Sequence, residues 1–194
     1  MATQGERRAG TRAALLDAAL ECLVDGGVAG CTTAAVCARA GVSSGALFNH
    51  FPSKAALLGA VAARVFDEAV AEYLARFAEI SPRSGDPLGD AVRLLWQTHD
   101  EPRLAAVLEL TVWARTDREL AAQLEQVNGP HTARVLGVAR DLLPAYADHP
   151  QFEAVFDLAV SAVFGVALGV VGEAERKHRI ETLVGVVHSQ LDAR

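Results

Sequence analysis

The sequence predicts an all-α fold of about nine helices, with an N-terminal helix-turn-helix domain of three helices ahead of a larger helical domain. Apolar residues recur at helical spacing along almost all of the 194 residues, and no run alternates apolar and polar residues long enough for a strand. Hydrophobic residues make up 51% of the chain, which supplies a substantial core and excludes a disordered protein. We expect the domains to span residues 1–55 and 56–194.

Three helices are expected in the N-terminal domain. The apolar face of the first helix consists of Leu15, Ala18, Ala19, Cys22 and Leu23. Gly26–Gly27 ends this helix. Thr32 caps a second helix that runs to about Ala40. Gly41 then provides a tight turn, and Ser43 caps a third helix over residues 44–50.

The remaining residues predict a long helix followed by several shorter ones. Ser53 caps the long helix, which runs to about Glu79, and the loop at 81–87 is the clearest break in the chain. Further helices are expected at about 87–98, 102–115, 117–127, 130–146, 150–172 and 173–192. Prolines stand at or near the start of several of these segments, where a helix accepts them.

The charge is unevenly distributed. The whole chain carries a net charge of −6. Residues 1–55 contain five Lys or Arg and four Asp or Glu, a net charge of +1, which leaves −7 for the remainder. A nucleic acid would therefore be attracted to the N-terminal end of the chain and repelled by the rest.

The cysteines and the apolar segments indicate a cytoplasmic protein. Cys22, Cys31 and Cys37 form no C-x-x-C pair, and no secretory signal is present, so we expect reduced, buried thiols and neither a metal site nor a cofactor. The most apolar stretch, 158–171, has about fourteen residues, whereas a membrane span needs roughly twenty. This stretch therefore predicts a buried interface helix and no membrane partner.

Residues 32–54, TTAAVCARAGVSSGALFNHFPSK, carry most of the functional information. Two short helices joined by A-G-V-S cannot form a core alone, and this arrangement is typical of a helix-turn-helix whose second helix enters the major groove of DNA. Leu47 and Phe51 are the expected inward anchors of that helix. Phe48, Asn49 and His50 are expected to project outward, where an asparagine can pair with adenine, and Lys54 is placed for a phosphate.

A serine hydrolase is the alternative function that the same residues suggest. Residues 41–45, GVSSG, match G-x-S-x-G, the nucleophile elbow of that class. The elbow works only on a sharp turn between a strand and a helix. Because no strand precedes these residues, we expect no enzymatic activity.

Two stretches, LLDAALECLVDGG and TTAAVCARAGVSSGALFNHFPSKAALL, include the specific arrangement A-G-V-S-x-G-x-[LF]-x-x-H-F-x-x-K. From Arg12 to about Val65 the chain resembles the DNA-binding domain of the TetR family of bacterial regulators. The resemblance implies that the positions near a phosphate at a helix start are Thr32 and Thr33. It implies that the positions facing bases or the nearby backbone are Ser43, Ser44, Gly45, Ala46 and Asn49. The positions flanking phosphates would be Phe48, His50 and Lys54.

The chain departs from the family pattern at two of these positions. Phe48 stands where the family usually has tyrosine, and Ala46 stands where relatives often have threonine. Each departure removes a hydroxyl group that could contact DNA. We expect these changes to affect DNA affinity or operator choice and not the fold.

The family resemblance implies a ligand pocket and a dimer surface in the C-terminal domain. Candidate pocket residues are Trp96, His99, Trp113, Arg115, Phe66 and Phe164. Few polar groups in an apolar wall favour a small apolar or aromatic effector. The smooth apolar face expected at the homodimer interface consists of Ala159, Ala162, Val163, Val166, Ala167 and Val170. Gly165 and Gly169, four residues apart, would let the backbones approach closely.

The sequence thus predicts a ligand-responsive transcriptional repressor that binds a palindromic double-stranded DNA operator as a homodimer. The alternative is a helical ligand-binding or interaction protein whose DNA-binding domain no longer binds an operator. The missing hydroxyl at Phe48 and the low basicity of the N-terminal domain leave this alternative open.

Overall fold

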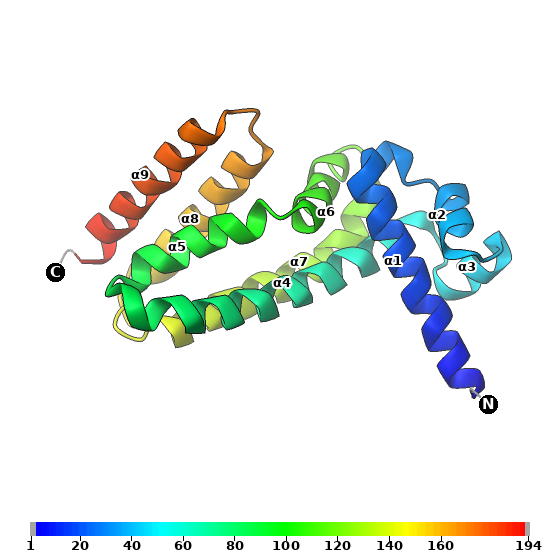
Figure 1. The fold of residues 1–194 in the computed structure, drawn as a ribbon, viewed down its shortest axis with the longest axis horizontal. Coiled ribbons are helices and arrows are strands. Elements are labelled where there is room, and N and C mark those ends of the chain that lie inside the picture. Colours follow the sequence, from blue (N-terminus) through cyan, green and yellow to red (C-terminus); the bar gives the residue numbers. More distant parts are fainter. Residues whose placement is uncertain (1–2, 193–194) are drawn as a thin grey trace. The chain divides into compact units, whose positions relative to one another are not determined.

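The computed structural model describes residues 3–192, which contain nine helices and no strand. The helices are α1 (Gln4–Gly30), α2 (Thr33–Ala40), α3 (Ser44–His50), α4 (Lys54–Ser84), α5 (Pro87–His99), α6 (Pro102–Trp113), α7 (Arg118–Leu142), α8 (Phe152–Leu168) and α9 (Glu173–Leu191) (Figure 1). The predicted all-α class is therefore confirmed. None of the described helices is both long and apolar enough to cross a membrane.

The chain divides into two compact units. The first comprises Met1–Phe66 and Ala106–Asn128, and the second comprises Asp67–Ala105 and Gly129–Arg194. Three helices, α4, α6 and α7, contribute residues to both units. The first unit therefore combines the predicted helix-turn-helix with the beginning of α4 and with segments of α6 and α7.

The caps predicted around the helix-turn-helix are present. The Thr32 hydroxyl accepts a hydrogen bond from the amide of Ala35 at 3.1 Å, and the Ser43 hydroxyl accepts one from the amide of Ala46 at 3.2 Å. Gly41 ends α2 in the left-handed conformation at φ 66°, which a glycine adopts without steric cost. Local sequence signals therefore fix both ends of the turn between α2 and α3.

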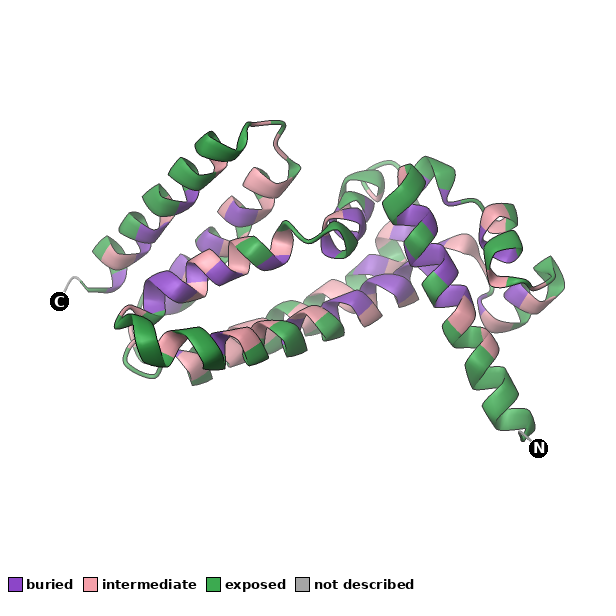
Figure 2. Cartoon of the chain, in the orientation of Figure 1, coloured by how far each residue is buried: buried purple, intermediate pink, exposed green. Residues whose placement is uncertain are grey.

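Large aliphatic side chains form the core of the first unit. Leu15 and Leu23 of α1, Val36 of α2, Leu47 of α3 and Leu57 of α4 are almost completely buried (Figure 2). Helix α2 packs against both α1 and α3. Helices α2 and α3 have eight and seven residues, and isolated helices of this length are only marginally stable. Burial against their neighbours therefore stabilises both.

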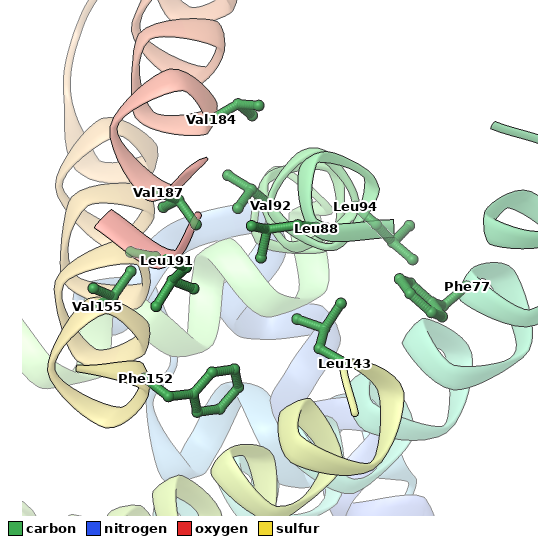
Figure 3. Packing of buried hydrophobic residues seen from close by; sticks show 11 residues of the cluster. Phe77, Leu88, Val92, Leu94, Leu143, Phe152, Val155, Val184, Val187 and Leu191 are labelled. Atoms are coloured by element: carbon green, nitrogen blue, oxygen red, sulfur yellow. The ribbon is translucent and has the colours of Figure 1, made fainter. Parts of the chain in front are cut away.

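The second unit has its own apolar core. Helices α5, α8 and α9 pack against one another in pairs. Leu88 and Val92 of α5 lie near Val187 and Leu191 of α9, while Phe152 enters the cluster from the start of α8 (Figure 3). The inward stripe of α9 consists of Ile180, Val184, Val187 and Leu191, at the three- and four-residue spacing of one helical face.

Two prolines lie inside helices where the sequence predicted breaks. Helix α4 continues through Pro82 to Ser84, so the predicted loop at 81–87 shortens to a turn at Gly85. Helix α7 runs without interruption through Pro130, where two helices were expected. The residue before Pro130 is Gly129, which lacks the Cβ that would clash with the proline ring. Proline has no N–H, so the carbonyl of Gln126, four residues earlier, lacks its helical hydrogen bond. Gln126 is exposed, so water can bind this carbonyl.

Candidate nucleic-acid interface

Helix α3 has one buried side and one exposed side. Leu47 and Phe51, at the end of the helix, are buried. The exposed residues are Ser44, Gly45, Phe48 and Asn49. Because positions three and four apart share a helix face, these four residues form one continuous surface, which we call the outer face of α3. The predicted inward anchors are confirmed.

The outer face of α3 is uncharged, and the folded chain does not use its polar groups. Among residues 3–192, no hydrogen bond joins the side chains of Ser44 or Asn49 to another residue. The ring of Phe48 is 49% exposed, which is unusual for a large apolar side chain. This combination of free amide, free hydroxyl and exposed ring suits contact with an external partner.

The other candidate DNA-binding residues, in α3 and beside it, differ in how far they are committed to the fold. Thr32 is exposed, whereas Thr33, Ala46 and His50 are half-buried. The His50 ring lies tilted against Phe51, with 6.5 Å between ring centroids. The hydroxyls of Thr32 and Ser43 accept the capping hydrogen bonds, but each keeps its own proton for an external acceptor.

Lys54 has a partner that the sequence did not predict. Its Nζ donates a hydrogen bond of 3.1 Å to the carbonyl oxygen of Val28. Val28 follows Gly27, whose φ of 61° breaks the regular path of α1. Lys54 therefore satisfies a carbonyl at the end of α1, and only its remaining N–H groups are available to a phosphate.

Two arginines of the first unit are committed to carboxylates of α1. Arg39 of α2 reaches Asp25 at 2.9 Å and Glu21 at 3.7 Å. Arg64 of α4 reaches Asp17 at 2.6 Å. These pairs tie α2 and α4 to α1. They also reduce the positive charge that the unit can offer to DNA.

The beginning of α1 carries further arginines, which are not committed in this way. Residues 4–10 are all exposed, as Figure 2 shows, and include Arg7 and Arg8. In the described part of the chain no ion pair involves either residue. A capping box between Thr3 and Glu6 starts the helix. We call residues 4–12 the basic arm. The sequence shows that these arginines are close together. Because they belong to no recognised motif, the sequence alone indicates only that they add to the positive charge of the N-terminal domain.

The candidate ligand residues are distributed over both units. Trp96 and His99 of α5 and Phe164 of α8 are half-buried in the second unit. Phe66, Trp113 and Arg115 belong to the first unit, where Phe66 is buried and the other two are exposed.

The imidazole of His99 has one hydrogen-bond partner in its own helix. Burial lowers the pKa of its imidazole, and a ring nitrogen, Nδ1, lies 2.8 Å from the carbonyl oxygen of Leu95. Because a carbonyl only accepts, Nδ1 carries the proton. In the neutral ring Nε2 is then an acceptor for a donor group. Burial likewise lowers the pKa of His131 on α7.

The candidate dimer residues in and just after α8 differ in exposure. Ala159 and Val163 are buried in the interior of their own chain. Ala162, Val166 and Gly169 are half-buried, Gly165 is exposed, and Val170 is completely exposed just after the helix. The outward stripe of α8, at spacings of three and four, instead consists of Ala154, Leu158, Ser161, Gly165 and Leu168. We call this set the outer stripe of α8.

Two other site types find no support in the described residues. Residues 3–192 contain no group of three His, Cys, Asp or Glu side chains that could hold a metal ion. The three cysteines are buried and form no disulfide, and burial raises the pKa of the Cys31 thiol to about 11. Residues 41–43 connect two helices and residues 44–45 begin α3, so the G-x-S-x-G match lacks the strand that a nucleophile elbow needs.

Comparison with known proteins associates the chain with helix-turn-helix regulators. Residues 15–61 match the family described as bacterial regulatory proteins, tetR family. The chain is 32% identical to an uncharacterized HTH-type transcriptional regulator of Mycobacterium tuberculosis, over 97% of this chain and 98% of that relative. It is also 40% identical to the HTH-type transcriptional regulator CymR of Pseudomonas putida, over 41% of this chain and 39% of CymR.

Solved structures share the fold at lower identity. A transcriptional regulator from Rhodococcus sp. RHA1 matches with a TM-score of 0.71 at 24% identity, covering 94% of this chain and 98% of that one. The multidrug binding protein EbrR, complexed with imidazole, matches with a TM-score of 0.67 at 22% identity, covering 90% of this chain and 93% of that one.

Proposed function

Because the chain belongs to the TetR family of DNA-binding transcriptional regulators, which are not enzymes, we propose that it is a ligand-responsive repressor that binds a palindromic operator as a homodimer. The observation that carries the proposal is the outer face of α3, whose amide, hydroxyl and aromatic ring have no role inside the folded chain. The major groove is wide enough for one helix and presents donors and acceptors that differ among base pairs.

The proposal divides the DNA contacts into two kinds. Ser44, Gly45 and Asn49 face base edges, with Phe48 beside them. Phosphate contacts come from residues in and around α3, namely Thr32, Thr33, Ser43, Ala46 through its backbone, His50, and the N–H groups of Lys54 that remain free. The basic arm supplies the positive charge that the remainder of the first unit lacks, because phosphate contacts provide most of the salt-dependent affinity.

The outer stripe of α8 is the proposed dimer surface. Leu158 and Leu168 are 54% and 38% exposed, and Val186 on the neighbouring helix α9 is 40% exposed. Exposed apolar side chains at this spacing, with Ser161 and Gly165 between them, allow a second helix to approach closely. A two-fold axis would present two α3 helices to half-sites about 34–36 Å apart.

A small apolar or aromatic effector is the proposed ligand, and the half-buried residues Trp96, His99 and Phe164 are its first candidates. The structural relative EbrR is described as a multidrug binding protein complexed with imidazole, which is a small aromatic molecule. Helix α4 contributes residues to both units, so a ligand that changes its tilt would change the spacing of the recognition helices. A coupling of about 1–3 kcal/mol is typical of such linked sites.

A cytoplasmic location is also proposed. Buried thiols without a disulfide suit a cytoplasmic protein.

A ligand-binding protein that has lost DNA binding is the competing function. The absent hydroxyl at Phe48 and the hydrogen bond that commits Lys54 to Val28 favour it. The test is binding of the full chain to duplex DNA from upstream of its own gene, measured by fluorescence anisotropy at several salt concentrations. A repressor gives an affinity that falls linearly with salt on a logarithmic plot, at a stoichiometry of two chains per palindrome. Salt-independent or undetectable binding overturns the proposal.

A further inference from the structure

We infer that α3 selects half-sites with A·T pairs at the positions that Phe48 and Asn49 contact, with Phe48 against a thymine methyl group and Asn49 paired with adenine. This inference depends on the proposed placement of α3 in the major groove. It concerns which bases are read, and it is carried by the chemistry and exposure of the outer face of α3.

The outer face has no side chain that reads a G·C pair selectively, because the hydroxyl of Ser44 can contact either kind of base pair. Arginine and lysine recognise guanine through its two major-groove acceptors, and glutamate and aspartate recognise the amino group of cytosine. Ser44, Gly45, Phe48 and Asn49 include none of these residue types. The cations nearby have partners in the folded chain: Arg39 pairs with Asp25, Lys54 binds the Val28 carbonyl, and the guanidinium of Arg12 lies over the Phe51 ring. Base selection by α3 therefore has to come from an amide, a hydroxyl and an aromatic ring.

Phe48 can recognise only an apolar feature of the groove. Its ring is 49% exposed and lacks the hydroxyl with which a tyrosine would donate to a phosphate. The C5-methyl group of thymine is the one apolar feature that distinguishes a base in the major groove. Covering that methyl group with the ring removes apolar surface of both partners from water.

Gly45 gives the DNA room to approach this ring. A Cβ atom at position 45 would meet its nearest neighbour, the Ser43 hydroxyl, at 3.8 Å, which is ordinary van der Waals contact. The fold therefore does not require glycine there, and glycine is less favourable than alanine within a helix. Position 45 lies one turn before Phe48 and Asn49 on the same face. A bare backbone at this point lets base edges come closer to both side chains.

The first experiment selects bound sequences from a duplex library with a randomised core, using the full chain. We expect each half-site enriched by the unaltered protein to have a thymine, in an A·T pair, at one position. Phe48→Ala should lose the preference at that position. We also expect an adenine preference that Asn49→Ala abolishes. If the unaltered protein enriches G·C pairs at the positions where these variants lose their preference, the inference is wrong. The repressor proposal would still hold. Failure to enrich any sequence contradicts both.

The second experiment replaces the selected thymine by deoxyuracil, which removes only the methyl group. Binding of the unaltered protein should weaken about fourfold, the effect of one buried methyl-sized group. Phe48→Ala should bind both duplexes equally, and Phe48→Leu should restore part of the discrimination. Val24→Ala, at an exposed apolar position of α1, is the matched control and should keep the fourfold ratio. Equal binding of the two duplexes by the unaltered protein overturns the role of Phe48.

Discussion

The guanidinium carbon of Arg12 lies 5.1 Å from the centroid of the Phe51 ring, a cation–π contact that joins α1 to the end of α3. Phe51 is buried beneath α3, whereas Arg12 is exposed. The last residue of the basic arm therefore lies beside the proposed recognition helix. Arg7 and Arg8 continue the same helix away from this contact (Figure 1).

The basic arm is predicted to bind phosphates that flank the half-site. Arg7→Ala combined with Arg8→Ala should weaken binding to all DNA sequences alike, because phosphates carry no sequence information. The slope of log affinity against log salt should fall by about 0.9 for each phosphate that the variant no longer neutralises. The melting temperature should stay the same, since both residues are exposed and unpaired among the described residues. Anisotropy titrations at several salt concentrations measure the slope.

Arg83→Ala combined with Arg118→Ala is the matched control, because it removes the same charge from two exposed positions outside the arm. This control should leave the slope unchanged. An equal decrease of the slope in the two double variants would show that net charge, and not the arm, is responsible.

Binding of the unaltered protein to vesicles of anionic lipid is not expected, because residues 4–12 have no large apolar side chain.

Gly45→Ala should separate stability from DNA binding. The new methyl group fits the free protein and replaces a poor helix former, so the free energy of unfolding should rise by a few tenths to about 1 kcal/mol. Operator affinity should fall several-fold, because the methyl group projects from the outer face of α3. Chemical denaturation and anisotropy measure the two effects. A variant that is more stable and binds DNA with unchanged affinity would contradict a close approach at this position.

Much of the helix-turn-helix could be predicted because its determinants are local. Thr32, Gly41 and Ser43 act within three or four residues of themselves, and the structure confirms the caps and the turn. The partner of Lys54 could not be predicted, since Val28 is distant in sequence and its carbonyl is free only because of the break at Gly27. Pro130 was expected to start a helix, and it continues one because Gly129 removes the steric clash.

The orientation of α8 shows a different limit. Its sequence is apolar on nearly every side, so periodicity could not distinguish the side that packs inward from the side that faces outward. The structure turns Ala159 and Val163 inward and leaves Leu158 and Leu168 exposed. Side-chain size also gave no guidance, because the larger leucines face outward whereas the smaller Val155, Ala159 and Val163 are buried.

Leu158→Lys should disrupt the proposed homodimer. A charge at the centre of the outer stripe of α8 would be buried without a partner in a dimer but remains hydrated in a monomer. We expect the mass measured by light scattering during gel filtration to fall from two chains to one. Val112→Lys, at an apolar position of α6 that is 47% exposed, is the control and should remain dimeric. A dimeric Leu158→Lys variant would place the interface on another surface.

His188 is predicted to make the stability of the second unit depend on pH. One of its ring nitrogens, Nδ1, lies 2.9 Å from Asp192, and Nε2 lies 3.0 Å from Asp86, which precedes α5. The hydrogen bond to Asp192 and the charge of Asp86 raise the pKa of His188, although partial burial opposes them. Arg93 of α5 also binds Asp86, and the Tyr146 hydroxyl donates to Asp192. The protonated imidazole therefore connects α9 to the start of α5.

The direction of the effect follows from the sign of the shift. Because the pKa of His188 is raised in the folded chain, its stabilisation is complete below the unfolded pKa of about 6.5 and is lost as the pH rises through the folded pKa. The pKa of Asp192 is lowered, chiefly by the hydrogen bond with His188, so its contribution is lost only in acid. His188→Gln should therefore lower the melting temperature more at pH 6 than at pH 8.5. His178→Gln, an exposed histidine of the same helix, controls for the loss of one imidazole and should give equal differences at both pH values. If the decrease in melting temperature caused by His188→Gln does not become smaller as the pH rises, the imidazole acts only as a neutral hydrogen-bonding group between the two carboxylates.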